Sequence, residues 1–267
     1  MRRLVFTIAV LVPAHAAAIF DLGLYTPAIE SPTDGVYVLA ENSAGETAGG
    51  NGRAFASNGA VTTDLGVLPG GSWSAAYAIS NSGFVAGYGD IGNGHFRAFV
   101  WRAAGGMTEL GTLGGQDSYG MAVNDRGLVA GSATTAMGYL HAFMGTARGL
   151  TDLGTLGGAV SFAYGINDAG QVTGFSVTGD GSLHAFLAYN GTMIDLNSLL
   201  AHDSGWMLTQ AFRIDNAGDI FGIGCYRGQL HNFELDPPVS VPEPCSFVLA
   251  LLGLGSSTLI GKYAARR

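Results

Sequence analysis

The sequence predicts an all-β protein, a five-bladed β-propeller, and three recurring phrases carry this prediction. The first phrase is an acidic residue followed by Leu-Gly, which returns at intervals of 43, 45, 43 and 43 residues. Its five copies begin at Asp21, Asp64, Glu109, Asp152 and Asp195, the last of which reads Asp-Leu-Asn. A unit repeated at this period indicates one supersecondary element that is copied and stacked.

Two further phrases keep the same step. A basic or polar residue precedes Ala-Phe, or Asn-Phe in the last copy, at Arg53, Arg97, His141, His184 and His231. A turn phrase rich in Asn, Asp, Ser and Gly occupies residues 42–45, 81–83, 124–127, 167–170 and 215–218. Residues that recur in every unit are expected to serve the architecture.

One unit is expected to form four short antiparallel strands. In the fourth unit these are residues 162–166, 171–176, 183–189 and 192–196. The turn phrase at 167–170 and Asn190-Gly191 separate strands, because Asn, Asp and Gly tolerate the left-handed backbone of tight hairpins. Four such strands per repeat are typical of a propeller blade.

The two ends of the repeat region complement each other. The last unit lacks a fourth strand, whereas residues 18–23 form a strand with no unit of its own. We expect this N-terminal strand to complete the last blade, so that residues 19–236 close into a ring without free sheet edges. An open β-solenoid is the alternative, and it would not need complementary ends.

Residues 1–18 read as a secretory signal peptide. Three residues with two arginines precede an apolar stretch, 4–12, that is too short to cross a bilayer. Small residues then satisfy the cleavage rule at two places, so that cleavage is expected after Ala16 or Ala18.

The C-terminal residues have three parts in a fixed order. A linker, 237–244, ends in a Pro-Glu-Pro motif, and residues 245–267 contain an apolar run and a basic end. The residues that define the predicted signal are Val241, Pro242, Glu243, Pro244, Arg266 and Arg267. The run predicts a short transmembrane helix with a positive cytoplasmic flank, and a plain membrane anchor is one reading of it.

This C-terminal arrangement closely resembles the PEP-CTERM sorting signal of exported proteins from Gram-negative bacteria that make exopolysaccharide. The resemblance implies that a membrane-embedded cysteine transpeptidase, exosortase, recognises Pro-Glu-Pro and removes the tail. Contact with the inner membrane would then be transient. Cys245 departs from the pattern, which usually has Ala or a small hydroxyl residue at this position.

The repeats are similar to those of the HAF-repeat family over residues 21–235. The family is named for the His-Ala-Phe phrase, which is present here at His141 and His184. This resemblance implies an extracellular or cell-surface location, and it implies no established activity.

Composition and spacing exclude several kinds of site. A net charge of −8 and a pI near 5.0 argue against nucleic-acid binding, which needs clustered Lys and Arg. The two cysteines form no disulfide framework or zinc pattern. The repeated histidines lie one blade apart, too far to share a metal, so we expect each imidazole to bond to backbone at a blade junction. No catalytic residue, metal or cofactor is predicted.

Residues that break the repeat are the better candidates for binding a ligand. Five of them occupy connections between a fourth strand and the next blade: Trp73, Asp117, Tyr119, Asp203 and Trp206. Aromatic rings beside acids are typical of sugar recognition, because the ring stacks on C–H faces and the polar groups bind hydroxyls. The alternative is that these aromatic residues pack between blades.

The sequence therefore favours a non-enzymatic, exported protein that has a structural or interaction role at the cell surface or in an extracellular matrix. Its expected partners are exosortase, extracellular polysaccharide and surface proteins. A sugar-binding propeller is the second hypothesis. An extracellular glycan-active enzyme is the third, and it would need two carboxylates about 5–10 Å apart, a pair that nothing in the sequence singles out.

Overall fold

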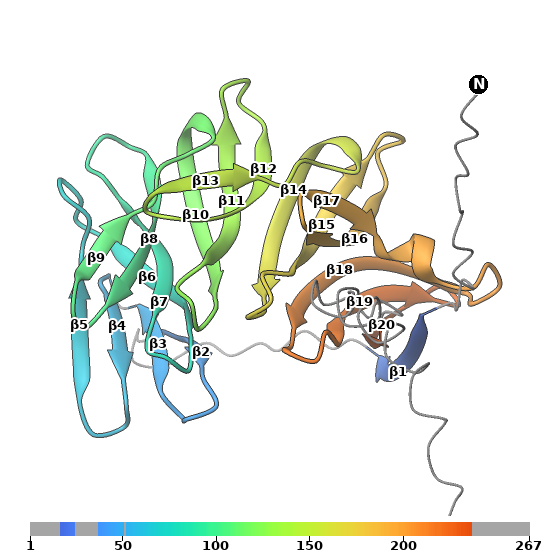
Figure 1. Ribbon diagram of the computed structural model, residues 1–267, viewed down its shortest axis with the longest axis horizontal. Coiled ribbons are helices and arrows are strands. Elements are labelled where there is room, and N and C mark those ends of the chain that lie inside the picture. Colours follow the sequence, from blue (N-terminus) through green and yellow to red (C-terminus); the bar gives the residue numbers. More distant parts are fainter. Residues whose placement is uncertain (1–16, 25–36, 51, 237–267) are drawn as a thin grey trace, which may run out of the picture. The chain divides into compact units, whose positions relative to one another are not determined.

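The computed structural model describes residues 17–24, 37–50 and 52–236, and all structural statements below concern these residues. They form an all-β protein of five four-stranded antiparallel sheets (Figure 1). The only helical element in these ranges is a 3₁₀ turn, η1 (Leu196–Leu199). Most of the predicted signal peptide, including Ala16, and the whole predicted tail, including Val241 and Arg267, lie outside the described residues.

The sheets follow the repeat. The first sheet contains β2 (Tyr37–Glu41), β3 (Thr47–Gly50), β4 (Ala54–Ser57) and β5 (Thr62–Gly66). The second contains β6 (Ser74–Ile79), β7 (Val85–Asp90), β8 (Phe96–Arg102) and β9 (Gly106–Glu109). The third contains β10 (Gly114–Val123), β11 (Val129–Thr135), β12 (Leu140–Thr146) and β13 (Gly149–Asp152). The fourth contains β14 (Gly157–Ile166), β15 (Val172–Thr178), β16 (Leu183–Tyr189) and β17 (Thr192–Asp195).

The fifth sheet takes one strand from the other end of the domain. Its own strands are β18 (Trp206–Ile214), β19 (Ile220–Tyr226) and β20 (Gln229–Asp236), and β1 (Ala18–Leu24) pairs antiparallel with β20. Ala18 lies opposite Asp236, and Asp21 lies opposite Phe233. The prediction that the N-terminal strand completes the last sheet is confirmed.

Each sheet packs on the next one in chain order. The first strand of every new sheet contacts the middle strands of the sheet before it: β6 contacts β3, β10 contacts β7 and β8, β14 contacts β11 and β12, and β18 contacts β15 and β16. No comparable strand packing joins the fifth sheet to the first within the ranges that the structure covers. The closed ring that the sequence predicts is therefore not observed, although its five sheets and its strand exchange are.

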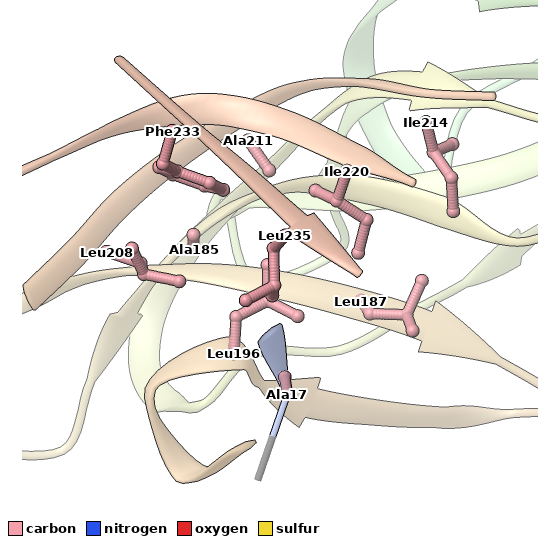
Figure 2. Close-up of a cluster of buried hydrophobic side chains, with 10 residues drawn as sticks. All are labelled: Ala17, Ala185, Leu187, Leu196, Leu208, Ala211, Ile214, Ile220, Phe233 and Leu235. Carbon is pink, nitrogen blue, oxygen red and sulfur yellow. The ribbon is translucent and has the colours of Figure 1, made fainter. Parts of the chain in front are cut away.

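Hydrophobic side chains fill the space between successive sheets. Figure 2 shows the cluster between the fourth and fifth sheets, where Leu187 and Leu196 meet Leu208, Ile220 and Leu235. The phenylalanine of the Ala-Phe phrase is fully buried in four of the five sheets, as Phe99, Phe143, Phe186 and Phe233. This recurrent burial explains why the phrase keeps its place in the repeat.

The second strand of each sheet contains a glycine at an equivalent position. The neighbouring strand leaves no room for a side chain there. A Cβ at Gly174 would lie 1.8 Å from the carbonyl oxygen of Phe162, and one at Gly131 would lie 1.9 Å from that of Tyr119. The equivalent residues Gly49, Gly87 and Gly222 meet a carbonyl oxygen in the same way. The glycine is therefore a packing requirement of the fold.

Candidate functional site

The recurring basic and acidic residues form one side-chain pair in every sheet. The pairs join the strand that carries Ala-Phe to its neighbour. They are Arg53–Asp64 at 2.8 Å, Arg97–Glu109 at 3.2 Å, His141–Asp152 at 2.9 Å, His184–Asp195 at 2.7 Å and His231–Asp21 at 2.8 Å. Each histidine contacts a carboxylate on the neighbouring strand of its own sheet, whereas a bond to backbone at a blade junction was predicted.

In four of the five pairs the aspartate also accepts a backbone N–H two residues further along the chain. Asp64 Oδ1 accepts the backbone N–H of Gly66, and Asp152 Oδ1 accepts that of Gly154. The hydrogen bond from Arg53 and then that from Gly66 lower the pKa of Asp64. His231 and then Gly23 act in the same way on the pKa of Asp21. These side chains are engaged in local structure.

A buried serine connects three pairs of neighbouring sheets, and sequence reasoning missed it. The hydroxyl of Ser161 accepts the N–H of Ala142 at 2.8 Å and donates to the carbonyl of Gly154 at 2.6 Å. Ser74 and Ser118 make the equivalent two bonds to the sheet before them. The sequence does contain a signal for these serines, because the three recur at intervals of 44 and 43 residues, close to the period of the repeat.

The fourth-to-fifth junction makes the same connection with different residues. By its pairing with Gly224, Leu208 stands where the second, third and fourth sheets have serine. Asn197 stands where the Leu-Gly phrase has Gly. The Asn197 amide donates to the Leu208 carbonyl at 2.9 Å and accepts its N–H at 2.7 Å. The altered phrase Asp-Leu-Asn therefore preserves the connection between sheets.

The turn phrases form a continuous series of hydrogen bonds across the five sheets, which we call the turn belt. Asn42 donates to the carbonyl of Ser80, Asn124 donates to that of Asn167, and Asn167 donates to that of Asp215. The second-to-third link uses Ser82, which donates to the carbonyl of Asp125. These links all donate towards the following sheet, and one further bond runs back, from the Asn216 amide to the carboxylate of Asp168.

The belt ends at Asp215, where the repeat changes from an amide to a carboxylate. Asp215 Oδ1 accepts the backbone N–H groups of its own turn, from Ala217, Gly218 and Asp219. An ionised carboxylate has no N–H to donate onward. Asp215 therefore replaces the amide at a turn from which, within the described residues, no link to a further sheet is observed.

A cavity of about 450 Å³ lies beside the turn belt, and all five sheets contribute to its lining. The larger apolar side chains of the lining are Tyr77, Met121, Tyr164 and Phe212. Arg213 is the one basic residue among the described lining residues. Tyr164 contacts Phe212 with 6.1 Å between ring centroids, and burial raises the pKa of the Tyr164 hydroxyl.

Three of the predicted ligand-binding residues lie in one aromatic cluster on the second and third sheets. The ring of Phe96 lies 6.2 Å from that of Trp73 and 6.1 Å from that of Tyr119. Asp117 Oδ1 accepts the backbone N–H of Phe96 at 2.8 Å. The Asp117 carboxylate also lies 3.3 Å from the imidazole of His95.

Trp73 is held by a carboxylate at the edge of this cluster. Asp90 Oδ1 accepts the backbone N–H of Trp73 at 2.5 Å and that of Ser72 at 2.8 Å. These two bonds lower the pKa of Asp90, with Trp73 giving the larger effect. Tyr88 lies centrally, with its ring 5.5 Å from that of Trp73, and burial raises the pKa of its hydroxyl.

The other two predicted residues belong to the fifth sheet. Trp206 is half-buried and stacks on Tyr226 with 4.8 Å between ring centroids, and its edge meets His231. Asp203 is exposed in the preceding loop. No ring contact joins Trp206 to the cluster around Phe96, so the structure brings the five predicted residues together as two groups.

No group of three or more His, Cys, Asp or Glu side chains suited to a metal ion occurs in the part of the chain that the structure describes. The same part contains no helix of the length and hydropathy needed to cross a membrane. The predicted transmembrane segment, 245–267, lies outside the described residues.

No protein-family model and no curated protein matches this chain.

Proposed function

We propose that this chain is an exported, non-enzymatic interaction or structural module of the cell surface or extracellular matrix. The five His- or Arg-carboxylate pairs are the observation that supports this function best. They use the most frequently recurring charged residues to join neighbouring strands. The repeated ion pairs thereby stabilise the scaffold. The residues that break the repeat are then available to bind a partner or ligand.

The scaffold in this proposal is a closed five-bladed propeller. Val38 on β2 is 58% exposed, whereas its equivalents Ala76, Ala163 and Ala211 are fully buried by the preceding sheet. Packing of the fifth sheet on β2 would cover Val38 in the same way. Both sheets also contribute to the lining of the cavity.

Ring closure is tested by placing a charge on β2. Val38→Arg is expected to lower the free energy of unfolding by about 2 kcal/mol or more, because closure would bury the guanidinium without a partner. Val61→Arg is the matched control, since Val61 is 62% exposed and lies outside this face. Equal effects of the two substitutions in urea unfolding would contradict closure.

The two ends of the sequence support export and sorting. The proposal gives residues 1–18 the role of a signal peptide and residues 237–267 that of a PEP-CTERM signal processed by exosortase. Replacing Pro242, Glu243 and Pro244 by alanine is expected to leave an unprocessed protein in the inner-membrane fraction of the native host. The unchanged chain should appear at the surface with a lower mass. Identical mass and location for both proteins would refute sorting by this motif.

A sugar-binding role is the second candidate, and the aromatic cluster around Phe96 favours it. Trp73 and Tyr119 are both half-buried, so each ring keeps an accessible part beside the carboxylate of Asp117. The measurement is binding of residues 17–236 to a broad glycan array. Saturable binding that is lost in Trp73→Ala or in Trp206→Ala would establish a lectin. The variant that loses binding would show which of the two aromatic groups binds the sugar. Silence from the folded protein would favour the structural role.

A further inference from the structure

The cavity beside the turn belt contains one residue that departs from the repeat in both size and charge. The units can be aligned on the first residue of each hairpin turn: Asn42, Ser80, Asn124, Asn167 and Asp215. Four sheets then place a small residue two positions earlier: Ala40, Ala78, Ala122 and Gly165. The fifth sheet places Arg213 there, and all five positions line the cavity. A Cβ at Gly165 would lie 3.0 Å from the Cα of Arg213, so this position is small where the following sheet packs on it. In the described residues no sheet packs on the fifth sheet in this way, which leaves room there for a larger side chain.

The guanidinium of Arg213 is positioned by an aromatic ring. Its Cζ lies 5.3 Å from the centroid of Phe221, which is the cross-strand partner of Arg213 on β19. The aligned residues in the other sheets are Ala48, Ala86, Ala130 and Thr173, so this ring is also specific to the fifth sheet. Stacking on an aromatic face leaves the N–H donors of an arginine directed outward in its plane.

Arg213 forms no ion pair with any residue in the described ranges. Three carboxylates also line the cavity, but each already accepts N–H donors: Asp125 from Ser82, Asp168 from Asp125 and Asn216, and Asp215 from its own turn. The lining therefore includes an exposed arginine that has no ion pair in the described ranges, beside three carboxylates that each accept N–H donors. A guanidinium in this state favours a bidentate anion such as a carboxylate.

The neighbouring apolar side chains indicate what the rest of the ligand should be. Phe212 is 40% exposed, and Tyr164 and Tyr77 lie in the same lining. The Tyr77 hydroxyl is hydrogen-bonded to that of Tyr88 at 3.0 Å, and the two rings stack with 5.0 Å between their centroids, so Tyr77 is already engaged. Rings such as those of Phe212 and Tyr164 stack on planar or pyranose rings. A volume of about 450 Å³ lies within the range of small-molecule sites.

We propose that this cavity binds a small ring-bearing carboxylate, with Arg213 as the residue that recognises the carboxyl group and Phe212 and Tyr164 as the surfaces that contact the ring. The lining adjoins the aromatic cluster around Phe96 through Tyr77, which stacks on Tyr88. The proposed site depends neither on export nor on a sugar-binding role of the cluster.

The test is calorimetric titration of residues 17–236 with two matched pairs of probes. Benzoate is compared with benzamide, and glucuronate is compared with glucose, so that each pair differs mainly in the charge while the two pairs differ in the ring. We expect at least one carboxylate to bind at least tenfold more tightly than its neutral counterpart, and added salt to weaken that binding.

Variants identify the site. Arg213→Ala should weaken carboxylate binding at least tenfold, and Arg213→Lys should restore only part of it, because an ammonium does not present the planar fork. Arg148→Ala is the control, since Arg148 is an exposed residue outside the cavity lining, and it should bind like the unchanged protein. Circular dichroism verifies that each variant is folded.

Two results would overturn the proposal. One is binding by Arg213→Ala that equals binding by the unchanged protein. The other is the absence of binding by both carboxylates up to about 10 mM, since a single guanidinium contact with ring stacking should reach the millimolar range. Neither result would bear on export, which the fractionation experiment tests.

Discussion

The imidazole Nδ1 of His231 lies 2.8 Å from the carboxylate Oδ1 of Asp21, although 210 residues separate the two in the chain. His141 and Asp152 make the same pair at 2.9 Å over 11 residues. The N-terminal strand therefore reproduces the side-chain contact of an internal repeat as well as its backbone pairing. β1 occupies the place of a fourth strand in full.

Removing this pair should loosen β1 selectively. His231→Ala is expected to increase amide hydrogen exchange in β1, because no short hairpin holds that strand beside β20. His141→Ala is the matched control. Its partner strand β13 follows β12 directly through a tight turn, so its exchange should change less. Equal changes in β1 and β13 would contradict a special role for the His231–Asp21 pair.

The serine between sheets should contribute strongly to stability. Ser161→Ala leaves the N–H of Ala142 and the carbonyl of Gly154 without the partner that they have now. The expected loss in the free energy of unfolding is about 1–3 kcal/mol, the range for buried groups left unsatisfied. Urea unfolding measures it. Ser198→Ala removes an exposed hydroxyl as a control, and a loss of the same size there would count against the connection.

The turn belt should depend on its amide donors. Asn124→Asp keeps the shape of the side chain but removes the N–H that donates to the Asn167 carbonyl, in a buried position. We expect a loss of about 1–3 kcal/mol in unfolding free energy. Asn93→Asp is a suitable control, because exposed Asn93 acts only as an acceptor, for the N–H of His95. A neutral effect of Asn124→Asp would contradict a stabilising role of the belt.

The Asp90 carboxylate should make stability depend on acidic pH. Backbone N–H bonds from Trp73 and Ser72 lower its pKa below the ordinary value of 3.8. A carboxyl group with a lower pKa in the folded than in the unfolded protein stabilises the fold at pH values above its unfolded pKa. This stabilisation is lost as the pH falls through the folded pKa. Asp90→Asn should therefore be less stable at pH 6, and the difference should shrink below about pH 3.8. Thermal unfolding at both pH values measures this, with Asp203→Asn as an exposed control. A constant difference would be the contrary result.

The structure also distinguishes the two predicted cleavage sites. The backbone N–H of Ala17 donates to the carbonyl of Leu199 at 2.9 Å, and Ala17 is buried in the cluster between the fourth and fifth sheets. Cleavage after Ala16 keeps these contacts, whereas cleavage after Ala18 removes them. We expect the mature chain to begin at Ala17. Mass spectrometry of the exported protein decides this, and an N-terminus at Ile19 would contradict it.

Much of the fold could be predicted because each phrase has one physical cause. The turn phrase needs Asn and Gly for its backbone, and the missing last strand could only come from the other end of the chain. The partner of His141 was harder to predict, because it depends on the register that sets β12 beside β13. A one-residue change of register would turn Asp152 to the other face of the sheet.

The candidate site was less predictable, because it depends on how separate sheets meet. Trp73 and Trp206 were both expected in a connection between blades. Trp73 precedes β6 whereas Trp206 is the first residue of β18, and each one packs against aromatic residues of its own sheet. Ser161 is inconspicuous in a chain with many serines until the junction is known. Arg213 could have been noticed by aligning the units on their turns, but only the cavity gives its charge a meaning.

The exchange of β1 sets an order for synthesis. β1 leaves the ribosome before any other strand of the domain, but its hydrogen-bonding partner is complete only at Asp236. The intervening sheets can assemble from local contacts while β1 waits, and loop closure over some two hundred residues then comes last. A chain that ends within β20 would keep four complete sheets and would expose the open edge of the fifth. Pairing of β1, the first strand to be synthesised, therefore requires that translation reaches the end of the domain.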